Sequence, residues 1–197
     1  MATRLPADQR RRQLLDISCG MFAERGFHAT AMDDIALAAG VTKPVLYQHF
    51  ASKRALYTEV LTDVGGQLLA RLADATSAAT SGRERVESGF RAYFRFVDGH
   101  RDAFRVLFGA AARNDTEFAA LVDAILDDVA TAVASLIAIE GTEEQRRVLA
   151  HAVVGIAEAT SRDAIGPNGE DLDPDRLAAW VAELAWFGLR GIRTDAG

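Results

Sequence analysis

The stretch AAGVTKPVLYQHF, residues 38–50, brings a glycine and a proline close together just before two apolar residues at helical spacing. Gly40 favours the left-handed conformation that ends a helix. Pro44 is tolerated in the first turn of a helix but not in its interior, so a second helix is expected to begin beside it. Leu46 and Phe50 lie four positions apart and would share one face of that helix. The stretch therefore predicts two short helices joined by a tight turn, a helix-turn-helix.

The composition favours a globular protein of the cell interior. The chain has 197 residues, of which 49% are hydrophobic and 25% are charged, which suits one compact unit or two small ones sharing a core. Its single cysteine, Cys19, excludes an internal disulfide and fits a reducing compartment. No apolar run approaches the roughly 18–20 residues that cross a bilayer. We therefore expect a cytoplasmic protein that makes no membrane contact.

The charge is unevenly distributed along the chain. Residues 1–60 hold eight Lys and Arg against six Asp and Glu, whereas the whole chain has a formal charge of −6. A locally basic end on an acidic chain is typical of a small nucleic-acid-binding module attached to another module. Arg10, Arg11 and Arg12 open the first helix and are either a solvated face or a set of phosphate contacts.

Helical spacing extends over the rest of the chain, and long alternating strand patterns are absent. The first helix is expected to end at Gly26, and Thr30 with Asp33 resembles a capping box for the second. A longer helix begins at Ser52 and contains the pair Gly65-Gly66. The remaining helices are expected at residues 83–98, 101–112, 115–139, 143–165 and 174–191, with linkers at 76–82 and 166–174. The sequence predicts an all-α fold of about nine helices.

The second helix of the motif presents side chains suited to reading DNA. In a helix-turn-helix the N-terminal side of this helix enters the major groove. Lys43 could donate to guanine, Gln48 could read adenine, and Pro44 or Val45 could contact a thymine methyl group. The phosphates would be bound by Tyr47, His49 and Lys53, aided by the start of the helix.

Residues 22–61, FAERGFHATAMDDIALAAGVTKPVLYQHFASKRALYTEVL, resemble the tetracycline-repressor (TetR) family of bacterial transcription regulators. The resemblance rests on Phe22, Gly26, Thr30, Ile35, Ala36, Gly40, Val41, Leu46, Tyr47, His49, Phe50 and Lys53. It implies that Tyr47 touches DNA and that His49 and Lys53 hold its backbone. The chain departs from the pattern at Ala31, where many relatives carry Ser or Thr, and at Asp33, a position that is basic in some relatives. The predicted DNA-binding residues are Thr30, Thr42, Lys43, Pro44, Val45, Tyr47, Gln48, His49 and Lys53.

The second half of the chain is rich in aromatic residues at helical spacing. Such residues form either a core or a pocket for an apolar ligand, and the family usually binds an effector there. The predicted ligand pocket comprises Phe90, Tyr93, Phe94, Phe104, Phe108 and Phe118.

The last two predicted helices carry more apolar surface than one core needs. A helix that is apolar on more than one side must be covered on more than one side. A symmetry mate would supply that cover, and the alternative is that both helices only close the core of the monomer. The predicted dimer interface comprises Val153, Ile156, Trp180, Leu184, Trp186 and Phe187.

No catalytic motif is recognisable, because HExxH, GxSxG, GxxxxGK[ST] and GxGxxG are all absent. We expect no enzyme activity, no cofactor and no metal site. The predicted organisation is a DNA-binding domain over residues 1–54 and an effector-binding and dimerisation domain over residues 55–197. The predicted function is a TetR-type repressor that binds a palindromic operator as a homodimer and is released by a small, largely apolar ligand. The alternative is a helical ligand-binding or interaction protein without a DNA-binding role.

Overall fold

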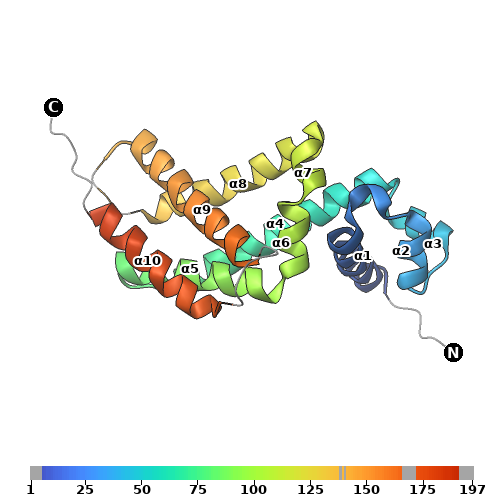
Figure 1. Cartoon of the computed structure of the whole chain (residues 1–197), viewed down its shortest axis with the longest axis horizontal. Helices are drawn as coiled ribbons and strands as arrows, with labels where there is room; N and C mark the ends of the chain where they lie inside the picture. Colours follow the sequence, from blue (N-terminus) through green and yellow to red (C-terminus); the bar gives the residue numbers. More distant parts are fainter. Residues whose placement is uncertain (1–5, 138, 140, 166–171, 191–197) are drawn as a thin grey trace. The chain divides into compact units, whose positions relative to one another are not determined.

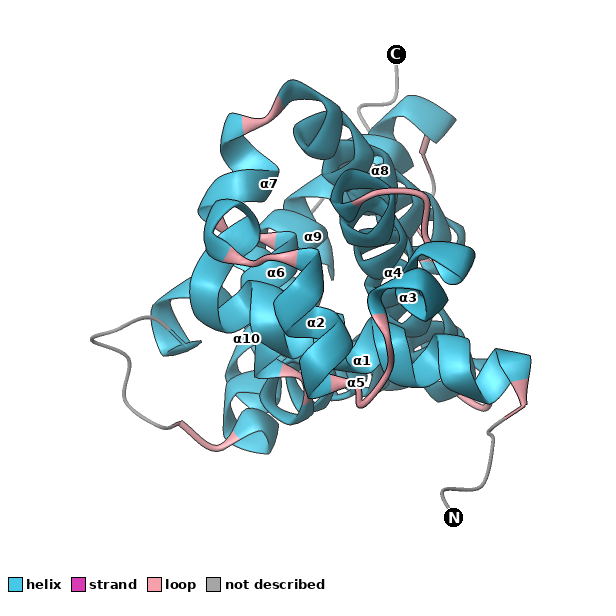
Figure 2. Ribbon diagram, turned by 90° about the vertical axis from the view of Figure 1, so that its right-hand side faces the viewer, coloured by secondary structure: helices cyan, strands magenta, loops and turns pink. Residues whose placement is uncertain are grey.

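The computed structural model describes residues 6–137, 139, 141–165 and 172–190, and these form helices without any strand (Figure 2). The helices are α1 (Ala7–Ala29), α2 (Met32–Ala38), α3 (Lys43–His49), α4 (Lys53–Ser77), α5 (Gly82–Gly99), α6 (Arg101–Leu107), α7 (Ala110–Asn114), α8 (Thr116–Leu136), α9 (Glu143–Ile165) and α10 (Pro174–Arg190). The predicted all-α fold is confirmed. Within the described ranges, no helix is both long and apolar enough to span a membrane.

The chain divides into two compact units. The first unit contains Met1–Val64 together with Asp102–Asp123, and the second contains Gly65–Arg101 together with Ala124–Gly197. Helices α4 and α8 each contribute residues to both units. Segment 102–123 therefore packs with the N-terminal helices, although it lies far from them in the sequence.

The helix-turn-helix of the first unit follows the prediction closely. Gly40 has a φ of +65° in the turn between α2 and α3, and Pro44 lies in the first turn of α3. Leu46 and Phe50 are buried, with exposed fractions of 0% and 1%. Gly26 has a φ of +78° and interrupts α1 near its end, so the predicted stop becomes a kink followed by one short turn.

Two predicted features of the helix ends are wrong. Helix α2 begins at Met32 after Ala31, and no side chain caps it, so the capping box of Thr30 and Asp33 does not form. The predicted helix over residues 101–112 is divided at Gly109, which has an extended backbone and separates α6 from α7. A side chain at this position would collide with the carbonyl oxygen of Arg105. The predicted linker at 166–174 lies outside the described residues except for its last three positions.

The second unit is held together mainly by α5, α9 and α10. Helices α5 and α10 lie side by side (Figure 1), and α9 also packs against both. The buried face of α5 is aromatic, and that of α10 consists mostly of small residues. These buried residues are Phe90, Tyr93, Phe94, Phe96 and Val97 on α5, and Leu177, Ala178, Val181, Ala182 and Ala185 on α10.

The two adjacent glycines of α4 have different surroundings in the second unit. A Cβ atom added at Gly65 would lie 2.6 Å from Cγ2 of Ile125 on α8, whereas one added at Gly66 would meet nothing within 4 Å. Close packing of α8 therefore explains Gly65 but not Gly66. No φ in the left-handed range occurs at either glycine.

We expect Gly66→Ala to raise the free energy of unfolding by about 1 kcal/mol, because alanine is the better helix former. Gly65→Ala should lower it by about 1–3 kcal/mol, since the new methyl group must displace Ile125. Urea unfolding of the two variants, followed by circular dichroism, checks this. Equal effects of the two substitutions would contradict the packing argument.

Candidate nucleic-acid interface

Helix α3 exposes the side chains that were predicted to read DNA. Thr42, Lys43, Pro44, Tyr47 and Gln48 are exposed. Val45 and His49 are half-buried, and Tyr47 keeps an exposed fraction of 42%. Leu46 and Phe50 hold the opposite face of the helix in the core of the first unit. One face of α3 is thus apolar and buried, and the opposite face is polar and aromatic and exposed.

Lys43 is paired with Asp33 of α2 across the turn. Its Nζ atom lies 2.8 Å from Oδ1 and 3.1 Å from Oδ2 of the carboxylate. The hydrogen bond from Lys43 to Asp33 raises the pKa of the lysine, so the ammonium stays protonated. Both side chains are more than half exposed, so the pair is weak and can open in water. The lysine ammonium has three N–H donors, so a donor remains for a base beside the contact with Asp33.

Thr30 was predicted to contact DNA, but the structure places it in the protein interior. Its exposed fraction is 1%. Its hydroxyl donates to the carbonyl of Gly26 at 2.8 Å and reaches that of Met21 at 3.3 Å. Thr30 therefore holds the kinked end of α1 together and has no surface to offer a phosphate. Thr42, in contrast, precedes α3 without forming a side-chain cap, which leaves its exposed hydroxyl available to a ligand.

Lys53 was predicted to hold the DNA backbone, but its ammonium is bound within the protein. Nζ donates to the carbonyl oxygens of Phe27 at 2.7 Å, Thr30 at 2.9 Å and His28 at 3.2 Å. It also lies 4.6 Å from the centre of the Phe27 ring. These three hydrogen bonds use all three N–H groups of a lysine ammonium. Lys53 joins the start of α4 to the end of α1 and to Thr30, which follows α1.

Arginines of the first helix also bind within the first unit. Arg11 pairs with Glu59 of α4, and its guanidinium lies 5.1 Å from the centre of the Phe50 ring. Arg12 contacts Asp16 at 2.5 Å and Asp63 at 2.6 Å. These contacts favour a structural role for the basic run of α1 over the predicted alternative of phosphate binding.

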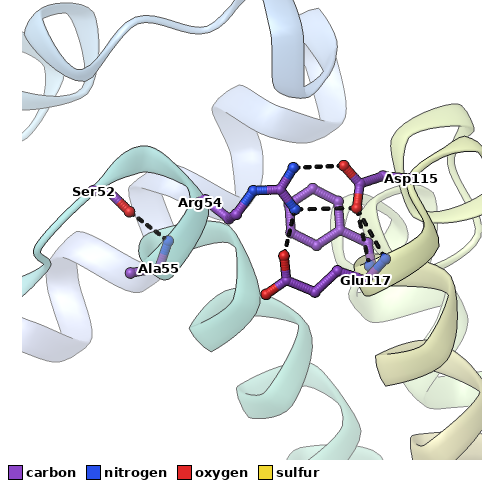
Figure 3. A network of polar contacts seen from close by, with 6 residues as sticks. Ser52, Arg54, Ala55, Asp115 and Glu117 are labelled. Atoms are coloured by element: carbon purple, nitrogen blue, oxygen red, sulfur yellow. Dashed lines mark hydrogen bonds and ion pairs between the residues drawn. The ribbon is translucent and has the colours of Figure 1, made fainter.

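Arg54, the residue after Lys53, belongs to a second cluster of polar contacts at the start of α4 (Figure 3). The guanidinium of Arg54 donates to both carboxylate oxygens of Asp115, at 2.6 and 3.1 Å, and to Glu117 at 2.7 Å. It also lies 4.6 Å from the centre of the Phe118 ring. Asp115 in turn accepts from the backbone N–H groups of Glu117 and Phe118 at the start of α8. This cluster links α4 to the corner between α7 and α8.

An aromatic cluster lies beside these contacts in the first unit. The ring of Phe118 is 4.6 Å from that of Tyr57 and 5.1 Å from that of Phe27, measured between ring centres. Phe22 packs edge-on against Tyr57 at 5.0 Å, and the hydroxyl of Tyr57 donates to the carbonyl of Val106 at 3.1 Å. Segment 102–123 is therefore joined to α1 and α4 by ring contacts, and to α4 by charges as well.

Six aromatic residues were predicted to form one pocket, and they fall into the two units. Phe104, Phe108 and Phe118 belong to the first unit, where Phe118 packs on Tyr57 and the rings of Phe104 and Phe108 lie 4.7 Å apart. Phe90, Tyr93 and Phe94 belong to the second unit and are buried there. A ligand site within the second unit can use only the latter three.

Comparison with known proteins agrees with this geometry. The family model described as "Bacterial regulatory proteins, tetR family" matches residues 14–60, and the model "Tetracyclin repressor-like, C-terminal domain" matches residues 83–188. The second match alone spans more than half of the chain. The chain belongs to the TetR family. It is a DNA-binding transcriptional regulator.

Two curated relatives of this TetR-family regulator match almost its whole length. The HTH-type transcriptional activator FasR of Mycolicibacterium smegmatis is 36% identical over 188 residues, which cover 94% of this chain and 85% of FasR. The HTH-type transcriptional repressor KstR2 of the same organism is 30% identical over 182 residues, covering 92% of this chain and 78% of KstR2. The relatives thus include both an activator and a repressor.

Solved structures share the fold of this regulator. A TetR-like transcriptional regulator from Rhodococcus sp. RHA1 superposes with a TM-score of 0.78 at 32% identity, covering 96% of this chain and all of the other. FadR of Bacillus subtilis, solved in complex with stearoyl-CoA, has a TM-score of 0.80 at 19% identity and covers 92% of this chain and 99% of its own. At that identity, the likeness to FadR concerns the fold alone.

Lys53→Met should lower the free energy of unfolding by about 1–3 kcal/mol, because methionine keeps most of the stem but leaves three carbonyl oxygens without the charged donor. The salt dependence of DNA binding should stay as in the wild type, since the three N–H groups of Lys53 already donate to carbonyl oxygens of the protein. Urea unfolding and fluorescence anisotropy over a salt series measure both. If Lys53→Met left the free energy of unfolding unchanged and reduced the salt slope of DNA binding by about 1, Lys53 would be a phosphate contact after all.

The cluster around Arg54 predicts a loss of stability in acid. The hydrogen bond from Arg54 lowers the pKa of Asp115 from 3.8 to about 2. Since this pKa is lower in the folded state, the carboxylate stabilises the fold above pH 4, and this stabilisation disappears as the pH falls towards 2. The urea midpoint should therefore drop less between pH 5 and pH 2.5 in Asp115→Asn than in the wild type. Parallel declines would show that the carboxylate does not contribute.

Proposed function

We propose that this regulator is a repressor that binds a palindromic operator as a homodimer and leaves it when a small, largely apolar effector binds. DNA binding is assigned to residues 1–54, and effector binding with dimerisation to residues 55–197. The observation that carries the proposal is the exposed face of α3. Leu46 and Phe50 are buried on the opposite face of this helix. The side chains of Lys53 and Thr30, in contrast, form hydrogen bonds within the protein. Lys43, Tyr47 and Gln48 are the side chains that this arrangement leaves for the major groove.

The exposed apolar surface of α10 supports a dimer. Trp180, Leu184 and Phe187 lie at positions i, i+4 and i+7 of one helix, and their exposed fractions are 50%, 64% and 57%. Such a stripe is unusual on a monomer of this size. Val148 of α9 is also exposed, at 58%, and Gly155 meets no neighbouring atom within 4 Å of a built Cβ. Small and apolar positions on two neighbouring helices suit the close approach of a second copy, as in a four-helix bundle.

The other predicted interface residues lie closer to the core. Val153 and Ile156 are half-buried on α9. Trp186 is half-buried, and its ring lies 3.3 Å from a Cβ built at Gly82 of α5. The proposed interface therefore centres on Trp180, Leu184 and Phe187, with Val153, Ile156 and Trp186 behind them. Two recognition helices related by a two-fold axis would read two half-sites of one operator.

An apolar effector is supported by the aromatic interior of the second unit. Phe90, Tyr93 and Phe94 are buried on α5, and the facing residues of α10 are small. The same fold holds stearoyl-CoA in FadR, so this scaffold can accommodate an apolar chain. We further propose that the protein has no enzyme activity and acts in the cytoplasm, where its DNA lies. A repressor blocks a promoter that its operator overlaps. The position of the operator relative to the promoter therefore decides whether the regulator represses or activates transcription.

The test uses duplex DNA from the region upstream of the protein's own reading frame, with sedimentation and anisotropy measured in parallel. Wild-type protein at micromolar concentration should sediment at twice 21.2 kDa and bind this DNA at nanomolar concentration. Phe187→Asp should sediment as the monomer. It should bind the operator DNA at least a hundredfold more weakly, because each monomer then binds one half-site independently of the other. Lys43→Ala should keep the dimer but flatten discrimination at one base pair, at a cost of about 1–3 kcal/mol.

A wild-type species near 21.2 kDa would overturn the dimer. An unchanged profile of operator mutations in Lys43→Ala would overturn the reading role of that residue. In vitro transcription from the same promoter then decides the sign of regulation: the proposal requires less transcript when the protein is present.

A further inference from the structure

Two hydroxyl groups in the interior of the second unit have no hydrogen-bond partner. They belong to Tyr93 of α5 and Ser161 of α9, two helices that pack together. The exposed fractions of these residues are 9% and 1%. Among the described residues, theirs are the two buried side-chain oxygen atoms left unpaired. Native interiors rarely leave such groups unpaired, because a buried hydroxyl has lost its water and gained nothing in return.

The two hydroxyls are neighbours in surroundings that are mainly apolar. Burial raises the pKa of Tyr93, and the nearby hydroxyl of Ser161 opposes that shift. The Tyr93 ring packs edge-on against Phe94 at 5.3 Å, and Phe94 stacks on Phe90 at 6.3 Å. Ala157, one turn before Ser161, is buried as well. Tyr93 is therefore a neutral donor at physiological pH, placed beside rings and methyl groups.

The charged groups near this pair neutralise each other. Glu158 and Arg162, which lie on α9 on either side of Ser161, form an ion pair at 3.2 Å. The charge of Glu158 raises the pKa of Tyr93, and that of Arg162 lowers it. Arg162 already has a carboxylate partner, and Glu158 would repel a second one. Among the residues that the structure describes, Arg162 is the cation that acts on Tyr93, so a ligand with a free carboxylate would have to compete with Glu158 for it.

We propose that Tyr93 and Ser161 form the polar contact of the effector site, and that they bind the carbonyl oxygen of a neutral, otherwise apolar ligand such as an ester, a thioester or a ketone. This assignment rests on the proposed function, since it names the ligand class of the effector. Both hydroxyls can donate to one carbonyl oxygen, which has two lone pairs. The apolar body of the ligand would lie against the rings of Phe90 and Phe94. A hydrocarbon without an oxygen would leave both hydroxyls unpaired.

The arrangement predicts opposite effects of one substitution on stability and on binding. Tyr93→Phe removes a hydroxyl that forms no hydrogen bond in the free protein, so its melting temperature should equal or exceed that of the wild type. The same variant lacks a donor to the ligand and should bind it more weakly. Ser161→Ala should behave in the same way. A hydroxyl with a merely structural role would lower the melting temperature when removed.

The experiment measures melting temperature and, by isothermal titration calorimetry on DNA-free protein, the binding of methyl laurate, 2-tridecanone and lauric acid at pH 7.5. The ester and the ketone should bind the wild type at least tenfold more tightly than the acid. Tyr93→Phe and Ser161→Ala should each weaken binding of the ester about tenfold, which corresponds to about 1.4 kcal/mol. Both variants should melt no earlier than the wild type.

Tyr57→Phe is the matched control, because the hydroxyl of Tyr57 is buried in the first unit and donates to the carbonyl of Val106. It should lower the melting temperature and leave binding of the ester unchanged. The proposal is overturned if the wild type binds neither ester nor ketone, if the acid binds as tightly, or if the variants at Tyr93 and Ser161 bind the ester as the wild type does. It is also overturned if Tyr93→Phe melts early, as Tyr57→Phe should. Failure of operator binding alone would overturn the proposed function instead, because these measurements contain no DNA.

Discussion

The ammonium of Lys53 and the three carbonyl oxygens around it hold the start of α4 against the end of α1. Phe27, His28 and Thr30 supply those oxygens at the point where the chain leaves α1 and approaches α2. The last carbonyls of a helix need donors, and the kink at Gly26 leaves this segment without a regular continuation. Lys53 supplies the donors from the first turn of α4. Helix α2 begins two residues after Thr30, which is fixed to α4 by this contact.

Arg54, the next residue, binds in a different direction. Its contacts with Asp115 and Glu117 join α4 to the start of α8, while Phe118 packs on Tyr57 beneath it. The first turn of α4 thus carries two neighbouring cations, one bound to the end of α1 and to Thr30, and one bound to segment 102–123. Both segments belong to the same compact unit.

Features that depend on neighbouring residues could be predicted from the sequence. Gly40, Pro44 and the spacing of Leu46 and Phe50 each follow from a local rule, and all four are found as expected. The roles of Thr30 and Lys53 could not be predicted in this way. In the sequence, Lys53 follows α3 by only a few residues, which suggests a contact with DNA. Its hydrogen-bond partners lie 23 to 26 positions away and are backbone carbonyl oxygens, which no pattern of side chains can indicate.

The second half of the chain shows the same limit more strongly. Helical spacing identified its helices, but spacing does not tell which helix a ring will pack against. Phe118 and Phe90 were therefore predicted to line the same pocket, although the two residues belong to different units. Tyr93 on α5 and Ser161 on α9 are brought together by the packing of these two helices, which no sequence motif indicates. The exposed stripe of α10 could be predicted in part, because Trp180, Leu184 and Phe187 follow the helical spacing. The inward position of Trp186 could not, because it depends on the contact of its ring with Gly82 of α5.

The central claim is that the protein recognises DNA through two copies of the exposed face of α3. Selection of binding sequences from a pool of random duplexes tests it most directly, since it presumes no operator. The account predicts enrichment of an inverted repeat with two half-sites separated by one or more helical turns, and loss of this enrichment in Tyr47→Ala. Enrichment of a single unpaired site, or an unchanged repeat without the Tyr47 side chain, would contradict it.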